Sequence, residues 1–234
     1  MEISSVIHRF MGGLVVSCQA FPGEPFFGPQ FMVEFAQCAL EGGAVGIRAN
    51  GPADVQAITN AVPLPVIGLY KIDLTGYTVR ITPHLDAGIQ IARAGAHIIA
   101  LDATSRKHPG NISTSALIQS IQEQTNLPVL ADISTFDEGL AAQDAGAQAV
   151  STTLSGYTDY SPQQEEPDFD LIERLCTHLS IPVIAEGRIS SPYEARKAFD
   201  LGAYAVIVGT AITRPQWIVS KFVQEIQTRG KLSK

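Results

Sequence analysis

The phrase "LPVIGLYK" at residues 64–71 returns as "LPVLADIS" at 127–134 and as "IPVIAEGR" at 181–188. In each copy a proline precedes a short aliphatic run, and such runs are typical of strands buried on both faces of a parallel sheet. Polar or charged residues follow each run. The three copies therefore predict three equivalent strands whose ends carry polar side chains.

A second phrase, which begins with glycine, alternates with the first. Its copies are "GAVGIRAN" at 43–50, "GAHIIALD" at 95–102, "GAQAVSTT" at 146–153 and "GAYAVIVG" at 202–209. They predict four more strands, and "GLVVSCQA" at 13–20 predicts the first strand of the chain. The sequence thus contains eight predicted strands, in which the two phrase types alternate.

Helices are expected in the intervals between the strands. Ser191 and Glu194 have the spacing of a capping box, which predicts a helix over 191–200. The same spacing of threonine and glutamate opens a predicted helix over 135–145. The last apolar segment, 214–230, is expected to form the eighth helix.

Eight strands alternating with helices predict an α/β fold, a single (β/α)8 TIM barrel that spans residues 1–234 as one domain. A doubly wound open sheet is the competing arrangement. No G-x-G-x-x-G follows the first strand, and the alternation runs through the chain without a break. Both observations favour the barrel.

Composition and charge exclude several classes of protein. The 234 residues are 45% hydrophobic and 17% charged, enough for a full core, and the net charge of −7 offers no surface for nucleic acid or an anionic membrane. The N-terminus lacks a signal-peptide pattern and no apolar run could cross a bilayer, so we expect a cytoplasmic protein. Cys18, Cys38 and Cys176 suit neither a disulfide framework nor a zinc site.

Polar side chains at the strand ends define a candidate site. Side chains alternate faces along a strand, so Glu186 shares a face with Ile184, and Lys71 shares one with Leu69. If the aliphatic members fill the barrel, the polar ones surround its C-terminal mouth, where TIM-barrel chemistry takes place. The same reasoning places at this mouth Ser17, Gln19, Arg48, Asp102 and Asp132.

Lys71 and Glu186 are the candidate acid–base residues. Burial lowers a lysine pKa and raises a carboxyl pKa, so either group can become a general base near neutral pH. A mutual contact opposes both shifts, and the sequence leaves open which group holds the proton. Magnesium bound by Asp102, Asp132 and Glu186 is an alternative, although it gives the lysine no role and no histidines have metal-ligand spacing.

A phosphate site is expected in the loops "EGRISSP" at 186–192 and "VGTAITRP" at 208–215. Gly187 and Gly209 allow close approach of backbone N–H groups, and an arginine in each loop supplies charge. Two long loops follow the third and sixth strands, and their tyrosines either cover a ligand or pack on one another. These tyrosines are Tyr77, Tyr157 and Tyr160.

Seven phrases over residues 12–219 closely resemble the N-acylmannosamine-6-phosphate 2-epimerases, a family of barrels of the ribulose-phosphate-binding type. The phrases are "VSCQA" (16–20), "GIRANG" (46–51), "IALDAT" (99–104), "LADIST" (130–135), "VSTTLSGYT" (150–158), "AEGRI" (185–189) and "GTAITRP" (209–215). The resemblance implies interconversion of N-acetylmannosamine 6-phosphate and N-acetylglucosamine 6-phosphate in amino sugar and sialic acid catabolism, without a cofactor.

The resemblance also implies roles for individual residues. Lys71 would work at C2 of the sugar, with Glu186 as its acidic partner. The implied substrate contacts are Gln19, Arg48, Asp132, Thr153 and Tyr157. The implied phosphate contacts are Gly187, Arg188, Gly209, Thr210 and Arg214. Tyr70 and His84 depart from the expected pattern and bear on fine substrate preference rather than on the reaction.

Epimerisation at C2 requires removal of the proton there, which is acidic only when C1 of the open-chain sugar is an aldehyde. We expect Lys71 to exchange this proton and Glu186 to orient the lysine or assist at the C1 oxygen. Two alternatives stay open: a Schiff-base aldolase that uses the same lysine, and a phosphosugar sensor without turnover. For assembly, we expect a homodimer.

Overall fold

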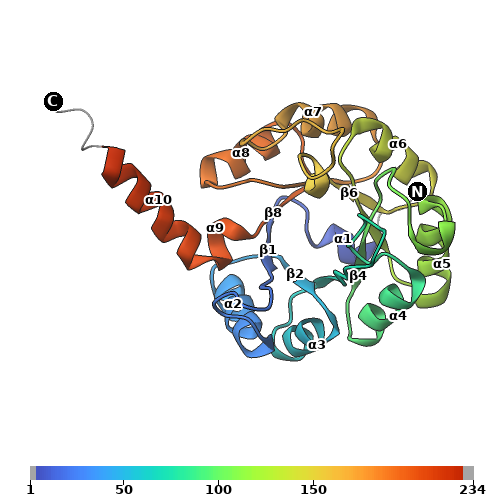
Figure 1. Ribbon diagram of the computed structural model, residues 1–234, viewed down its shortest axis with the longest axis horizontal. Coiled ribbons are helices and arrows are strands. Elements are labelled where there is room, and N and C mark those ends of the chain that lie inside the picture. Colours follow the sequence, from blue (N-terminus) through green and yellow to red (C-terminus); the bar gives the residue numbers. More distant parts are fainter. Residues whose placement is uncertain (1–3, 229–234) are drawn as a thin grey trace.

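The computed structural model describes residues 4–228, which form a closed barrel of eight parallel strands in chain order, surrounded by helices (Figure 1). The strands are β1 Leu14–Cys18, β2 Gly46–Asn50, β3 Val66–Leu69, β4 Ile98–Asp102, β5 Val129–Asp132, β6 Ala149–Ser151, β7 Val183–Glu186 and β8 Ala205–Val208. The expected (β/α)8 barrel is confirmed.

Helices alternate with these strands along the described chain. They are α1 Ser5–His8, α2 Pro29–Glu41, α3 Pro52–Ala61, α4 Leu85–Arg93, α5 Thr114–Thr125, α6 Phe136–Asp144, α7 Phe169–His178, α8 Pro192–Asp200, α9 Thr210–Thr213 and α10 Pro215–Thr228, with short 3-10 turns η1 Pro109–Asn111 and η2 Thr152–Leu154. Both expected capping boxes are present, at Thr135 before α6 and at Ser191 before α8.

The repeated prolines stand where each strand enters the barrel. The carbonyls of Pro65, Pro128 and Pro182 accept hydrogen bonds from the second residue of a neighbouring strand, a role that does not require an N–H on the proline. The strands are shorter than the phrases that predict them: β3 ends at Leu69, so Lys71 lies beyond it in an isolated antiparallel bridge with Ile81.

The barrel interior is apolar below its mouth. Leu69, Leu130 and Ile184 pack together inside, as the alternation of faces predicts. The short helix α1 was not expected from the sequence, and it places Phe10 in this interior cluster. A Cβ on Gly46 would lie 2.4 Å from the Phe10 ring, so glycine is needed there. Because Gly46 begins β2, Phe10 plugs the end of the barrel that lies opposite the mouth.

The eighth helix forms but does not cover the barrel as expected. Helix α10 extends away from the ring of helices (Figure 1), and none of its described residues is buried. Phe222 and Ile226 are each 68% exposed. The last two residues of the expected helix, 229–230, lie outside the described part of the chain. Within residues 4–228 no helix has the length and hydrophobicity to span a bilayer.

Candidate active site

A cavity of about 990 Å³ opens at the C-terminal mouth of the barrel. It brings together most of the residues that the sequence predicts for the site, from the ends of six different strands. Those on its wall are Ser17, Gln19, Lys71, Asp102, Thr153, Tyr157, Glu186, Gly187, Arg188, Gly209, Thr210 and Arg214. Two more predicted residues lie directly behind this wall. Arg48 on β2 contacts Glu186, and Asp132 on β5 contacts Thr153.

Arg48 organises the floor of the cavity through two carboxylates. Its Nη1 and Nη2 donate to the two Asp132 oxygens at 3.0 and 2.6 Å, a bidentate pair, and Nη1 lies 3.1 Å from Glu186 Oε2. The side chains of Arg48 and Asp132 are 1% and 0% exposed. Although burial opposes it, the two carboxylates raise the pKa of Arg48. The guanidinium is therefore a permanent buried cation.

Thr153 connects the same two carboxylates on the cavity side. Its hydroxyl lies 2.9 Å from Asp132 Oδ1 and 2.8 Å from Glu186 Oε2. A hydroxyl has one hydrogen to donate, so it serves one of the two oxygens at a time. A proton on Glu186 would satisfy the second contact. Burial raises the pKa of Glu186 above its ordinary value, against the opposing effect of Arg48.

Lys71 faces this network from the end of β3. Asn50 Oδ1 accepts a hydrogen bond from the Lys71 backbone N–H at 2.8 Å and fixes the residue at the mouth. Burial and the Arg48 cation lower the pKa of Lys71 to about 8, while the carboxylates of Glu186 and Asp132 oppose that shift. The amine therefore titrates close to neutral pH, as a general acid–base residue must.

Two buried polar atoms in this region have no partner among the described residues. Gln19 donates to Ser17 Oγ at 2.8 Å, which leaves its carbonyl Oε1 without a hydrogen bond, and Arg48 Nε is also unpaired. Buried polar groups are normally hydrogen-bonded, and an unpaired acceptor beside a cavity is suited to a donor on a ligand. An amide N–H or a sugar hydroxyl has this character.

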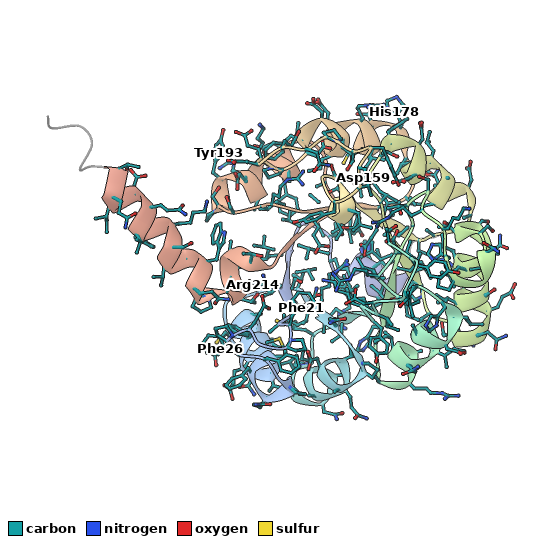
Figure 2. All side chains as sticks on the ribbon, in the orientation of Figure 1. Phe21, Phe26, Asp159, His178, Tyr193 and Arg214 are labelled. Carbon is teal, nitrogen blue, oxygen red and sulfur yellow. The ribbon has the colours of Figure 1, made fainter. Side chains whose placement is uncertain are left out.

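The expected phosphate end shows two arginines with different attachments. Arg188 donates to the carbonyls of Ser155 at 2.6 Å and Glu166 at 2.8 Å, so its guanidinium fastens the loop between β6 and α7. Arg214 pairs with Glu24 at 3.0 Å and remains on the cavity wall. Figure 2 shows Arg214 beside Phe21 at the base of α10.

Comparison with known proteins places this geometry in a family. A family model described as "Putative N-acetylmannosamine-6-phosphate epimerase" matches residues 32–228. The chain belongs to this family. It is 49% identical over 225 residues to a relative from Caldanaerobacter subterraneus subsp. tengcongensis, across 96% of this chain and 95% of the relative. A relative from Clostridioides difficile is 46% identical, across 95% and 99%. Both bear the name "Putative N-acetylmannosamine-6-phosphate 2-epimerase".

Solved structures agree with the family assignment. The N-acetylmannosamine-6-phosphate 2-epimerase from Clostridium perfringens has a TM-score of 0.92 to this chain at 41% identity, with 96% of this chain and 97% of that chain covered. A thiamine phosphate pyrophosphorylase from Pyrococcus furiosus, at 17% identity and a TM-score of 0.58, shares the fold alone.

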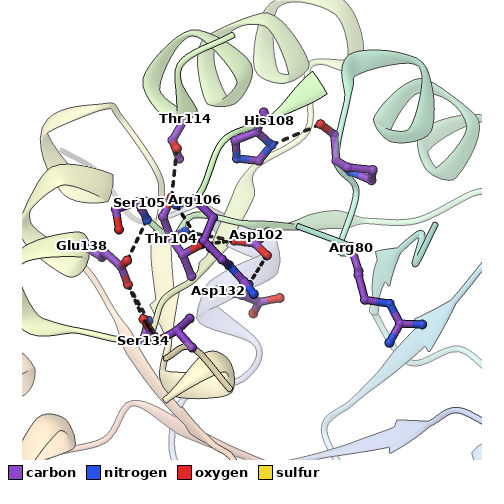
Figure 3. A network of polar contacts seen from close by, with 12 residues as sticks. Arg80, Asp102, Thr104, Ser105, Arg106, His108, Thr114, Asp132, Ser134 and Glu138 are labelled. Atoms are coloured by element: carbon purple, nitrogen blue, oxygen red, sulfur yellow. Dashed lines mark hydrogen bonds and ion pairs between the residues drawn. The ribbon is translucent and has the colours of Figure 1, made fainter. Parts of the chain in front are cut away.

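Several side chains of the site carried no clear signal in the sequence. Arg106 lies in the loop after β4, between two of the repeated phrases, and it reaches the cavity wall. It pairs with Asp102 at 2.6 Å, and its Nε donates to Thr104 Oγ1 at 2.9 Å; Figure 3 shows these residues from close by. Phe21, Thr78, Arg80, Trp217 and Lys221 also line the cavity. These five residues lie in loops and in a helix outside the repeated sequence phrases, so no pattern in the sequence points to them.

The three tyrosines take different positions. Tyr157 lines the cavity, whereas the Tyr160 hydroxyl donates to Glu138 at 2.7 Å on the outer side of the loop. Tyr77 lies on the long loop after β3 and is 36% exposed. Of the three, Tyr157 is therefore the residue placed to cover a ligand.

The acidic side chains at the mouth are already paired with cations. Asp132 is held by Arg48 and Asp102 by Arg106. Within residues 4–228, no group of three or more histidine, cysteine, aspartate or glutamate side chains is arranged to hold a metal ion. The carboxylates thus position basic side chains in this site.

Proposed function

We propose that this protein interconverts N-acetylmannosamine 6-phosphate and N-acetylglucosamine 6-phosphate by removing and returning the proton at C2, without a cofactor. The observation that carries the proposal is a lysine with a pKa of about 8 that lines the same cavity as Glu186, in front of a buried Arg48–Asp132 pair. Family membership supports the choice of substrate.

Lys71 supplies the acid–base group. With a pKa of about 8, roughly a quarter of the amine is neutral at pH 7.5, compared with about 0.1% for an ordinary lysine. The neutral amine takes the C2 proton of the open-chain aldehyde, and the resulting ammonium returns a proton to the other face of the enediolate. The substrate carbon must turn relative to Nζ between the two transfers.

Glu186 acts at the C1 oxygen. Its raised pKa favours a protonated carboxyl, which can donate a hydrogen bond to the oxygen that gains charge as C2 loses its proton. Thr153 and Arg48 hold this carboxyl in place. The unpaired Gln19 Oε1 accepts a hydrogen bond from the substrate, for example from its amide N–H. Tyr157 closes over the bound sugar.

The phosphate lies at the opposite end of the cavity, between the loops after β7 and β8. Gly187 and Gly209 leave room for the phosphate beside the backbone. The first N–H groups of the short helix α9, which begins at Thr210, have no partner within that helix. Arg214 and Arg188 contribute positive charge to this end. Together they fix C6, and the sugar chain then extends toward Lys71.

Proton NMR in deuterated buffer tests the proposal directly. Wild-type protein mixed with N-acetylmannosamine 6-phosphate should replace the C2 proton by deuterium while N-acetylglucosamine 6-phosphate accumulates. K71M should show neither deuterium exchange at C2 nor accumulation of product, and E186Q should retain slow exchange at C2. K197M is the matched control, because Lys197 of α8 lies over the ring of Phe169 and is not among the residues that line the cavity.

Two results would contradict the proposal. Retention of C2 exchange in K71M would exclude the lysine as the acid–base group. Borohydride trapping of a covalent adduct between Lys71 and the substrate would instead indicate a Schiff base, which deprotonation at C2 does not require.

We also propose that the chain acts as a homodimer through α10, in the cytoplasm. A single helix of 14 residues is marginally stable in water without tertiary contacts. Val219, Phe222 and Ile226 follow at intervals of three and four residues and form an exposed apolar stripe. A second copy related by two-fold symmetry carries the same stripe and can cover it in an isologous contact.

The cysteines support the cytoplasm as the location of the protein. All three thiols are free, which is typical of a reducing compartment.

Light scattering coupled to gel filtration tests the dimer. F222E/I226E should elute with the mass of a monomer, whereas wild type should elute as a dimer at micromolar concentration. M11E is the matched control, since Met11 is 59% exposed but lies near the plugged end of the barrel. A wild-type monomer, or an equal effect of M11E, would contradict the proposal.

A further inference from the structure

Phe21 lies between the two cations that the proposed reaction uses. Its ring centroid is 5.1 Å from Lys71 Nζ and 5.8 Å from Arg214 Cζ, both within the range of a cation–π contact. The ring lines the same cavity as both cations. Phe21 follows β1 in a loop, and Figure 2 shows it next to Arg214.

Glu24 holds this ring in place. Its Oε2 accepts hydrogen bonds from the Phe21 backbone N–H at 2.8 Å and from Arg214 Nη2 at 3.0 Å. The Glu24 N–H donates in turn to the Phe21 carbonyl at 2.9 Å. One carboxylate thus fixes the aromatic residue and the arginine of the expected phosphate end together.

Other charges surround Lys71, and they make the contribution of the ring specific. Arg48 and Arg80 repel its ammonium form, and Glu186 and Asp132 attract it. A carboxylate attracts the ammonium but also competes for its N–H groups. An aromatic face attracts the cation without accepting a strong hydrogen bond, and that attraction is lost when the amine is neutral. The ring can therefore orient the charged amine while leaving it free to reach a substrate.

We propose that Phe21 is a positioning residue for the proposed C2 proton transfer: its ring, fixed by Glu24, holds the Lys71 ammonium at the cavity between the phosphate end and Glu186. The inference rests on the proposed function for its role in turnover. The contact itself is a property of the protein without substrate, so it can be tested apart from the reaction.

The sign of the expected effect follows from the form that the ring stabilises. Phe21 favours the protonated amine, so its removal lowers the Lys71 pKa further below the ordinary lysine value. The strength of a cation–π contact corresponds to a shift of about half a unit to one and a half units. The Lys71-dependent limb of the pH–rate profile should move to lower pH by the same amount, whether the lysine acts as base or acid.

Titration of 13C-dimethylated lysines by NMR measures the Lys71 midpoint without turnover, with the resonance assigned from a K71R variant. F21L should lower the midpoint, and F21W should keep it at the wild-type value because its ring restores the contact. F27L is the matched control, since Phe27 lies in the same loop, 49% exposed and outside the cavity lining. F21M replaces F21L if thermal melting shows that leucine disturbs folding.

Kinetics then connects the contact to the reaction. In F21L, kcat for C2 exchange should fall about 5- to 30-fold while KM changes less than about threefold, and F21W should recover kcat. A midpoint in F21L within about 0.2 unit of wild type, or an equal shift in F27L, would overturn the inference. If the midpoint shifts as expected but wild type has no epimerase activity, the contact stands and the proposed function fails.

Discussion

Replacement of Arg48 by methionine tests the buried ion network on which the site depends. Methionine keeps the apolar stem of the side chain and removes three charged contacts, two with Asp132 and one with Glu186. Because Asp132 is 0% exposed, no water can replace the lost guanidinium without rearrangement of the barrel mouth. R48M therefore leaves the buried Asp132 carboxylate without the cation that pairs with it.

The expected cost is large relative to the stability of a domain. Removal of one partner from a buried ion pair costs about 3–5 kcal/mol, against a typical total of about 5–15 kcal/mol. For a chain of this length, the loss corresponds to a fall in Tm of roughly 6–20 °C. Loss of the guanidinium also removes the effect of Arg48 that opposes the raised pKa of Glu186, so this carboxyl protonates more readily and the loss should be smaller at pH 5 than at pH 8.

Urea unfolding at both pH values measures these effects. R48M/D132N, which removes the orphaned charge, should recover at least about 1 kcal/mol relative to R48M. R196M is the matched control: Arg196 pairs with Asp200 at 3.9 Å, but both side chains are exposed, so little change is expected. A loss below about 1 kcal/mol in R48M, or no recovery in the double variant, would refute the reasoning.

Three further predictions concern single groups. C2 exchange should rise with pH through a midpoint near 8 and level off at about pH 9, because the neutral amine of Lys71 is the base; a continued rise to pH 10 would contradict the lowered pKa. G156A should free the β6–α7 loop, because the new Cβ would lie 2.0 Å from Arg188 Nη1 and Gly156 has a φ of +81°, and limited proteolysis should cut this loop faster than in wild type. Iodoacetamide should modify the exposed Cys38 and spare Cys18, whose pKa burial raises to about 12; mass spectrometry of the modified peptides decides this.

The strands and three of the helices could be predicted with their approximate bounds from local patterns. Each copy of the first phrase combines a proline, an aliphatic run and a polar end within eight residues, and each copy of the second combines an opening glycine with an aliphatic run. Capping boxes such as Ser191 with Glu194 are equally local, and the structure places α8 where they predict it. The direction of α10 could not be predicted this way, because its apolar stripe would suit packing on its own barrel as well as contact with another surface.

The candidate site could be predicted as a set of residues but not as a network. Alternation along the strands brings Lys71, Glu186 and Asp132 to one mouth, which needs only the barrel and the position of each residue. The partners of Arg188 and Arg214 depend on loops 22–33 and 190 residues away in the chain. Phe21 stands in a loop without periodicity, so nothing in the sequence distinguishes it from the neighbouring phenylalanines.

The charges at the mouth also constrain the chemistry. With Glu186 ionised, Lys71 and Arg48 balance Glu186 and Asp132, so the four groups carry no net charge to meet an enediolate. With Glu186 protonated, they carry one net positive charge, and the single hydrogen of Thr153 can serve Asp132 while Glu186 donates its own. The raised pKa of Glu186 favours this second state. The same proton thus satisfies the hydroxyl contacts in the resting protein and supplies a hydrogen bond to the C1 oxygen when charge develops there. E186Q, which can donate but cannot ionise, should therefore retain more activity than E186A in the C2 exchange assay; equal loss in the two variants would show that the carboxyl acts in its charged form.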